Sequence, residues 1–170
     1  RNLGMRLCNT KYLAFLDSDD FWDKEKLRDQ INFMSKANFQ ITYCDYYVFR
    51  ENQKENIINK TNVHMLFNLS TFMNNSSINT STLIVEKSII GNTRFKKIPL
   101  LEDYIFKCDL FRKGLSAHKL NKCNTAYRLT EKTRSSSKIK NLLTLWSLNK
   151  KYNNLNLLIF FFYITIYLIF

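Results

Sequence analysis

The chain has 170 residues and a formal net charge of +12 at pH 7. Hydrophobic residues make up 45% of it, with three glycines and one proline, which excludes a disordered chain and indicates a packed globular one. The length suits one domain's worth of core.

The first half of the chain shows alternating patterns of helix and strand. Residues 1–9 predict the end of a helix, and the apolar run of residues 12–16 predicts a buried strand of a parallel sheet. Residues 23–36 predict a helix, with Asp23 as its N-cap or a first-turn acid. The buried face of this helix is expected to carry Leu27, Ile31 and Met34.

The middle of the chain is harder to interpret. Residues 41–49 are rich in Tyr, Val and Ile and predict a strand. A polar loop is expected over residues 50–61, a short helix over 63–69, a loop over 74–80 and a strand over 81–85.

The last third begins with a predicted helix over residues 103–113, with Gly114 just past its end. Residues 119–129 are expected to be extended and residues 138–152 helical. The alternation of strands and helices indicates an α/β sheet. Ligands of such sheets bind beyond the carboxyl ends of the strands.

The charge is unevenly distributed. No acid follows Glu131, whereas the basic residues Arg134, Lys138, Lys140, Lys150 and Lys151 all do. A basic stretch beside an apolar tail fits an anionic membrane surface better than a nucleic-acid groove. We therefore expect contact with a membrane surface and no nucleic acid, against the plainer alternative of a basic soluble surface.

Both ends of the chain lie inside patterned segments, so we expect a fragment of a larger protein. We divide it into residues 1–134 and a helical part, residues 135–170, which is basic and then apolar. A membrane span needs about 20 apolar residues. The stretch over residues 155–170 is shorter, so a truncated transmembrane helix, an interfacial helix and a core-packing helix stay open.

Acids cluster directly after the first apolar run. Six of the fourteen acidic residues lie between Asp17 and Asp29. If the chain is extended there, Asp17 and Asp19 point the same way and serve one ligand. Mn²⁺ or Mg²⁺ suits such oxygen ligands and would neutralise the acids. The alternative is a solvated acidic turn that caps the following helix.

These residues also resemble a known family. Arg1-Asn2-Leu3-Gly4, the apolar run, Asp17 to Trp22, and Glu25-Lys26-Leu27 with Gln30 resemble glycosyltransferase family 2 in order, spacing and residue type. The family pattern is RNxG, a hydrophobic strand, LDxDD, an aromatic pair and KLxxQ. Further matches continue to about residue 140, at Asn79-Thr80-Ser81, Phe95, Glu102-Asp103-Tyr104, Tyr127-Arg128 and Arg134-Ser135-Ser136.

The resemblance is strongest to bacterial enzymes that build cell-surface polysaccharide or lipopolysaccharide. It implies a GT-A fold, which is a Rossmann-like mixed sheet flanked by helices, here incomplete at its N-terminus and followed by C-terminal helices. Residues 1–134 would then be a partial catalytic domain. The implied activity is metal-dependent, inverting sugar transfer from a nucleotide-sugar donor, first of all a UDP-sugar. The acceptor would be a hydroxyl of a glycan or a lipid-linked acceptor, at the cytoplasmic face of the cell membrane.

The resemblance also implies residue roles. Asp19 and Asp17 would bind Mn²⁺ or Mg²⁺, and Arg1 and Asn2 would join them in the nucleotide-sugar site. Asp103, of the Glu102-Asp103 pair, would be the general base that deprotonates the acceptor. The alternative for this pair is two helix-start acids favoured by the macrodipole.

Three positions depart from the family pattern: Thr10 replaces a usual Gly, Lys24 a frequent Pro and Lys107 a frequent Trp. We expect these to affect turn geometry and packing more than chemistry. His64 and His118 are isolated and are expected to be surface or packing residues. The aromatic run from Tyr43 to Phe49 is expected to serve as sheet core more than as a sugar platform.

Alternative functions remain. A truncated non-catalytic remnant, or a protein that only binds, is the first. A phosphohydrolase of the haloacid-dehalogenase type is the second, although that chemistry needs a Thr soon after the acids, where Phe21 and Trp22 stand.

Overall fold

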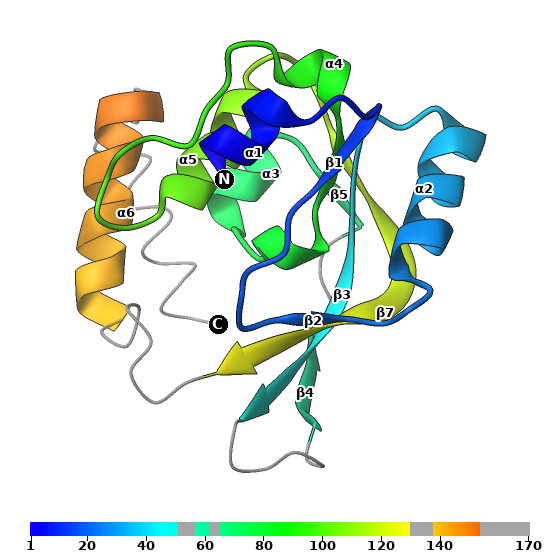
Figure 1. The fold of residues 1–170 in the computed structure, drawn as a ribbon. Helices are drawn as coiled ribbons and strands as arrows, with labels where there is room; N and C mark the ends of the chain where they lie inside the picture. The colour runs from blue at the N-terminus through cyan, green and yellow to red at the C-terminus, as the bar shows by residue number, and fades with distance from the viewer. Residues whose placement is uncertain (51–56, 62–64, 130–137, 154–170) are drawn as a thin grey trace.

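The computed structural model describes residues 1–50, 57–61, 65–129 and 138–153, which form a mixed α/β structure (Figure 1). The strands are β1 (Tyr12–Ala14), β2 (Phe21–Trp22), β3 (Ile41–Arg50), β4 (Ile57–Thr61), β5 (Leu66–Phe67), β6 (Ile84–Glu86) and β7 (Ala117–Leu129). The helices are α1 (Asn2–Leu7), α2 (Lys26–Ala37), α3 (Leu69–Asn74), the 3-10 turn η1 (Thr80–Thr82), α4 (Lys87–Ile90), α5 (Glu102–Phe111) and α6 (Lys138–Asn153).

The described strands form one seven-stranded sheet with the order β1-β6-β3-β7-β2, in which β4 also pairs with β3 and β5 with β7. The long strands β3 and β7 are parallel, and the other pairs are antiparallel. The expected parallel pairing of the first strand was therefore wrong: β1 runs antiparallel to β6, with Leu13 opposite Val85. An apolar run indicates that a strand is buried, but a buried strand can pair in either direction.

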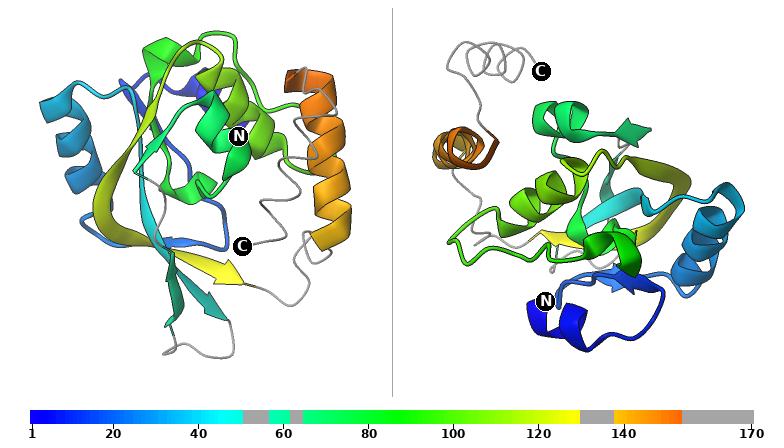
Figure 2. Two further views of the ribbon diagram at one scale, coloured as in Figure 1. Left: turned by 180° about the vertical axis from the view of Figure 1, so that it is seen from behind. Right: turned by 90° about the horizontal axis from the view of Figure 1, so that it is seen from above.

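Helices lie on both sides of the sheet. Helix α2 covers one side, whereas α3 and α5 lie on the other, with α6 outermost against α5 (Figures 1 and 2). Three phenylalanines bring the core together under α1: the rings of Phe95 and Phe106 stack at 4.2 Å, and Phe15 meets both edge-on. This cluster supports the segment that continues from β1.

Helix α6 is held to α5 by polar contacts as well as by packing. The Tyr104 hydroxyl donates to Asn149 Oδ1 at 2.7 Å, and Arg112 donates to the Tyr152 carbonyl. The helix predicted over residues 138–152 is thus confirmed. In the part of the chain that the structure describes, no helix is long and apolar enough to cross a membrane, and the apolar tail of residues 155–170 lies outside that part.

Helix α2 presents a face to the core that matches the predicted one only in part: Met34 is buried as expected, Ile31 is half-buried and Leu27 is exposed. It begins at Lys26 after Glu25, so Asp23 is not its N-cap. Its buried residues are Lys26, Gln30 and Met34, whereas Leu27 is 41% exposed. Contacts of two polar side chains explain this face: Lys26 Nζ lies 4.1 Å from the centre of the Trp22 ring, and Gln30 Nε2 donates to Thr42 Oγ1 and the Thr82 carbonyl at 3.0 Å. Hydrophobic periodicity does not record either contact.

The predicted loop and helix between β3 and α3 also differ from the structure. Strand β4 occupies residues 57–61 by pairing with β3, where the polar composition had suggested a loop. Strand β5 and α3 replace the short helix, because Asn68 and Thr71 form a reciprocal capping box that starts α3 at Leu69. His118 pairs with this region of the sheet and stacks on Phe39 at 3.7 Å, as expected of a packing histidine; His64 lies outside the described residues.

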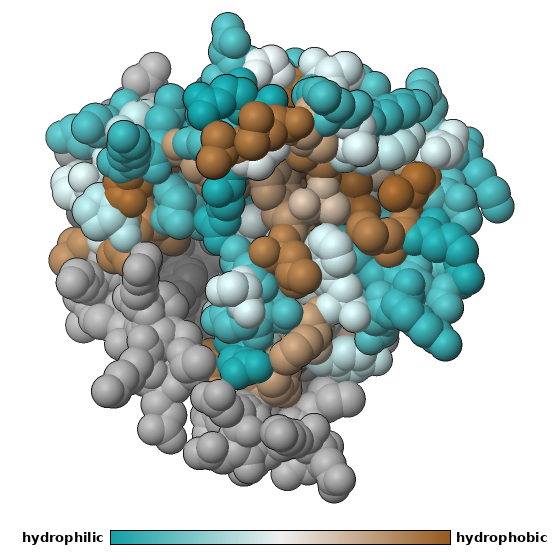
Figure 3. Space-filling model, in the orientation of Figure 1, coloured by the Kyte–Doolittle hydropathy of each residue, from teal (hydrophilic) through white to brown (hydrophobic). Residues whose placement is uncertain are grey.

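Apolar side chains reach the surface in separate patches on the face shown in Figure 3. The large apolar side chains that are exposed on the described elements include Leu3 and Leu7 of α1, Leu16 after β1, and Leu27 of α2. Single exposed leucines of this kind are common on soluble proteins. Leu27 therefore contributes little to the core, although its spacing from Met34 suggested otherwise.

The structure makes a sharp prediction for this pair. Met34 is 1% exposed. Met34→Ala is expected to lower the free energy of unfolding by about 2–5 kcal/mol, because it leaves a cavity in the core. Leu27→Ala, on the same helix, should lower it by less than about 1 kcal/mol. Urea unfolding followed by circular dichroism measures both, and equal losses would contradict the observed face of α2.

Candidate active site

The acids after β1 lie on a turn over residues 17–20, which we call the acidic turn. The Asp20 backbone N–H donates to the Asp17 carbonyl at 3.1 Å, so the segment is folded back and not extended. The alternation of side chains that was expected to aim Asp17 and Asp19 together therefore does not apply. Asp19 is exposed, Asp17 is half-buried, and Asp20 is buried at 5% exposure.

Asp20 fixes this turn to two other elements. Its carboxylate accepts a hydrogen bond from the Ser81 hydroxyl at 2.5 Å and from the Arg128 backbone N–H at 3.1 Å. Burial raises the pKa of Asp20, and the neighbouring charges of Asp19 and Asp17 add to the rise, against the two hydrogen bonds. The carboxylate thus connects the acidic turn with η1 and with the end of β7.

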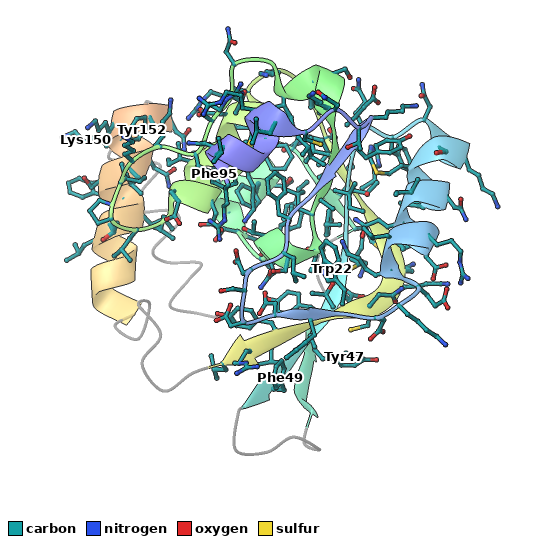
Figure 4. The ribbon with its side chains drawn as sticks, viewed as in Figure 1. Trp22, Tyr47, Phe49, Phe95, Lys150 and Tyr152 are labelled. Carbon is teal, nitrogen blue, oxygen red and sulfur yellow. The ribbon has the colours of Figure 1, made fainter. Side chains whose placement is uncertain are left out.

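Ser81 is the centre of these contacts. Its hydroxyl also accepts a hydrogen bond from the Asp17 backbone N–H at 3.1 Å, and its carbonyl accepts one from the Trp22 indole at 2.6 Å. Figure 4 shows Trp22 on the interior side of β2, toward η1. Asp17, at the start of the acidic turn, and Trp22, just after it, are therefore both bound to Ser81 of η1.

Arg1 links the acidic turn with the start of α5. Its guanidinium forms an ion pair with Asp17 and a second with Glu102, where Nη1 and Oε1 are 3.3 Å apart. Burial alone would lower the pKa of Arg1, but Asp17, with Asp103 and Glu102, raises it. Arg1 also lies over the Phe95 ring at 5.2 Å. The two acidic groups that the sequence singled out thus lie together in the fold.

Asn2 has a positioning contact. Its side-chain amide donates to the Phe95 carbonyl, and its side-chain carbonyl accepts from the Phe95 N–H, both at 2.9 Å. This reciprocal pair fixes α1 to the segment before α5, beside the Phe95 ring labelled in Figure 4. A contact between Asn2 and a nucleotide stays a prediction.

Asp103, at the start of α5, is held by two side chains. Thr80 Oγ1 donates to its Oδ2 at 3.0 Å and Lys107 Nζ donates to the same oxygen at 2.8 Å. Burial on its own would raise the pKa of Asp103, but the Lys107 charge and these hydrogen bonds lower it to about 2. The group is therefore a carboxylate at neutral pH, as a base must be.

Sequence reasoning missed four residues that organise this site: Thr80, Ser81, Lys107 and Arg128. Thr80, Ser81 and Arg128 were noticed only as parts of motifs. Lys107 was expected to affect packing more than chemistry; the structure places its ammonium on the Asp103 carboxylate. The signal was available, since residues four apart on a helix are neighbours.

Arg128 closes the other side of the acidic turn. Its Nε donates to the Asp19 carbonyl at 3.1 Å, and its guanidinium lies over the rings of Phe21 and Phe49, 5.4 and 5.6 Å from their centres. Phe49 lies with Tyr47 toward the end of β3 (Figure 4). Tyr43, at the start of the same strand, is buried core as expected, whereas Phe49 borders the acidic turn.

The residues present suit a divalent cation that is shared with a ligand. Among the residues that the structure describes, no three His, Cys, Asp or Glu side chains come together as a closed metal cage. The exposed Asp19 carboxylate has no hydrogen bond or ion pair within this part of the chain, and Asp17 lies in the same turn. Mg²⁺ is typically held by one or two carboxylates plus substrate phosphates, which matches this donor set.

The chain is similar in sequence to known glycosyltransferases. The model of the family described as glycosyl transferase family 2 matches residues 1–115. The chain is 31% identical over 146 residues to the Escherichia coli UDP-Glc:alpha-D-GlcNAc-diphosphoundecaprenol beta-1,3-glucosyltransferase WfaP, covering 84% of this chain and 55% of that protein. It is 27% identical over 146 residues to the Escherichia coli enzyme of the same description, WfgD, covering 86% of this chain and 56% of that protein. The chain thus spans about half the length of these relatives.

Solved structures show the same fold. Residues 1–349 of S. aureus TarS in complex with UDP-GlcNAc superpose with a TM-score of 0.61 at 16% identity, covering 80% of this chain and 40% of that one. The complex of the same TarS fragment with UDP gives a TM-score of 0.60 at 15% identity, covering 76% of this chain and 39% of that one. The predicted GT-A mixed sheet flanked by helices is confirmed by this similarity.

Proposed function

The chain belongs to glycosyl transferase family 2, and we propose that it carries the acids that bind the donor and the acid that acts as the base. The enzyme would transfer a sugar from a UDP-sugar to a hydroxyl of a glycan or lipid-linked acceptor. One observation supports this above the others. Adjacent residues of η1, Thr80 and Ser81, bind the candidate base and the acidic turn, so that two acids distant in sequence form one site.

The acidic turn is the proposed donor site. Asp19 and Asp17 would hold Mn²⁺ or Mg²⁺ together with the donor diphosphate, and the cation would stabilise the charge that develops on that leaving group. The exposed Asp19 carboxylate offers oxygen ligands, while Arg128 fixes the backbone beneath it. Arg1, already paired with Asp17, supplies positive charge at the same place.

Asp103 is the proposed general base. Transfer with inversion needs a base on the face opposite the leaving diphosphate. As the acceptor oxygen bonds to the sugar, its O–H becomes far more acidic than that of an alcohol, so a carboxylate of low pKa can take the proton. Glu102, paired with Arg1, holds the start of α5 against the acidic turn.

The lipid-linked acceptor is supported by the relatives, since WfaP and WfgD are named as enzymes that act on a diphosphoundecaprenol-linked sugar. A protein that uses such an acceptor works at a membrane, and we propose the cytoplasmic face. Helix α6 offers exposed Leu143 and, near its end, the exposed Lys150 and Lys151. The Lys150 ammonium lies over the Trp146 ring at 5.6 Å, next to these groups.

Donor binding tests the metal assignment. UDP is expected to bind in the presence of Mn²⁺, and Asp19→Asn should weaken binding by about 10–100-fold, because a coordinating charge is lost. Asp23→Asn is the matched control, since Asp23 is exposed near the same turn but lies outside the proposed site. Titration calorimetry measures both. Unchanged affinity in Asp19→Asn would refute the metal site, and absence of UDP binding would favour the non-catalytic alternative.

Product analysis tests the base and the stereochemistry. With UDP-glucose and a GlcNAc-diphosphate lipid, the complete gene product that carries this chain is expected to form a β-linked product. Asp103→Asn should lower kcat by roughly 10²–10⁴-fold, because the base is lost. UDP affinity should remain as in the wild type. NMR of the product gives the anomeric configuration; an α-linked product would exclude inversion, and an active Asp103→Asn would exclude this base.

Membrane contact is tested with vesicles. Reversing two charges in Lys150→Glu/Lys151→Glu is expected to lower binding to phosphatidylglycerol vesicles by at least about tenfold, since each basic residue contributes about 1 kcal/mol near an anionic surface. Lys11→Glu/Lys24→Glu carries the same charge change at exposed positions away from α6. Co-sedimentation measures both. Equal losses in the two variants would show that only net charge matters and that α6 is not the contact.

A further inference from the structure

Lys107 places a positive charge inside the protein. Its side chain is 3% exposed, and its ammonium donates to Asp103 Oδ2 and to the Ile78 carbonyl, each at 2.8 Å. It also lies 6.0 Å from the centre of the Phe72 ring. A lysine is rarely buried unless it is paired, so its position is set by these partners.

The contacts of Asp103 are one-sided. Thr80 and Lys107 both donate to Oδ2, and among the described residues no side-chain donor binds Oδ1. The Asp103 side chain is 34% exposed, although the lysine beneath it is buried. Oδ2 is therefore held by two side-chain donors, whereas Oδ1 faces no side-chain donor of the described residues.

We propose that Lys107 is a positioning residue that holds Asp103 with Oδ2 turned inward and thereby presents Oδ1 to the acceptor hydroxyl. This inference rests on the proposed function, in which Asp103 is the base. It adds to that function Lys107, a position at which this chain departs from the family pattern. The orientation of the base depends on the lysine one turn further along α5.

The proton balance of the step is simple. The acceptor oxygen forms a bond to the anomeric carbon, and the bond from that carbon to the diphosphate oxygen breaks with its electron pair on the diphosphate. The acceptor proton moves to Asp103 Oδ1. Lys107 keeps all its protons and stays on Oδ2, so it orients and stabilises the carboxylate before transfer and takes no proton itself.

Removing the charge should change the titration of the base. In Lys107→Met, burial of Asp103 is no longer opposed by the ammonium, so the pKa of Asp103 rises from its low value. Protonation would then inactivate the base as the pH falls, and below that pKa kcat drops about tenfold per pH unit. The wild type keeps its carboxylate ionised and shows no such acid limb above about pH 5.

The test compares three variants of the complete gene product. Lys107→Met removes the charge at similar length, and Lys107→Arg keeps it. Lys113→Met is the matched control, because Lys113 likewise donates to backbone carbonyls, those of Ile89 and Ile90, away from Asp103. UDP release from UDP-glucose with acceptor gives kcat and KM against pH, carbon-13 NMR of the carboxyl group follows the titration of Asp103, and thermal unfolding checks the fold.

A positioning role predicts that Lys107→Met lowers kcat at least about tenfold and moves its acid limb upward, with the donor KM unchanged within about twofold. Lys107→Arg should restore the wild-type pH profile, and Lys113→Met should keep it. A folded Lys107→Met with the wild-type kcat, acid limb and Asp103 titration would overturn the proposal. So would a uniform loss of kcat at every pH with an unshifted titration, which indicates a structural ion pair only.

The base role of Asp103 and the positioning role of Lys107 are distinguished by these variants. If Asp103→Asn retains full activity, the base assignment fails, and the positioning role fails with it, whatever the NMR titration shows. If Asp103→Asn is inactive but Lys107→Met titrates and reacts like the wild type, the proposed function stands and only the role of Lys107 is overturned.

Discussion

The buried carboxylate of Asp20 is the contact on which the site depends. It binds the Ser81 hydroxyl and the Arg128 backbone N–H, and so joins the segment after β1, the turn η1 and the end of β7. A buried acid without such donors would be costly, and donors without the acid would be equally unsatisfied. The exposed Asp19 can therefore sit on a fixed turn because its buried neighbour supplies the attachment.

Two acids of this site show how surroundings set function. Burial, with the nearby charges of Asp19 and Asp17, raises the pKa of Asp20, whereas the cation of Lys107 lowers that of Asp103 although it too is partly buried. The first acid holds three segments together, and the second is the acid that we propose as the base. Between them, Arg1 balances Asp17 and Glu102 and prevents a concentration of uncompensated negative charge.

The sequence was sufficient for the fold class and for the two acidic motifs, because these depend on local pattern and on family resemblance. It failed where a contact crosses elements. The buried face of α2 is set by the Lys26 ammonium over the Trp22 ring and by the hydrogen bond from Gln30 to Thr42. Lys26 and Gln30 are polar, so hydrophobic periodicity assigns them to the solvent side. The capping box at Asn68 and Thr71 has a local sequence signature, whereas the hydrogen bond from Thr80 to Asp103 has none.

The turn η1 has a consequence for how this protein can vary. Because Thr80 and Ser81 are neighbours on one short turn, any change that tilts η1 moves Asp103 and the acidic turn at the same time. Substitutions at the two positions are therefore non-additive, as expected for residues that share a support. A change that affects only the acidic turn or only Asp103 therefore has to arise elsewhere in the chain, because at η1 the two are coupled.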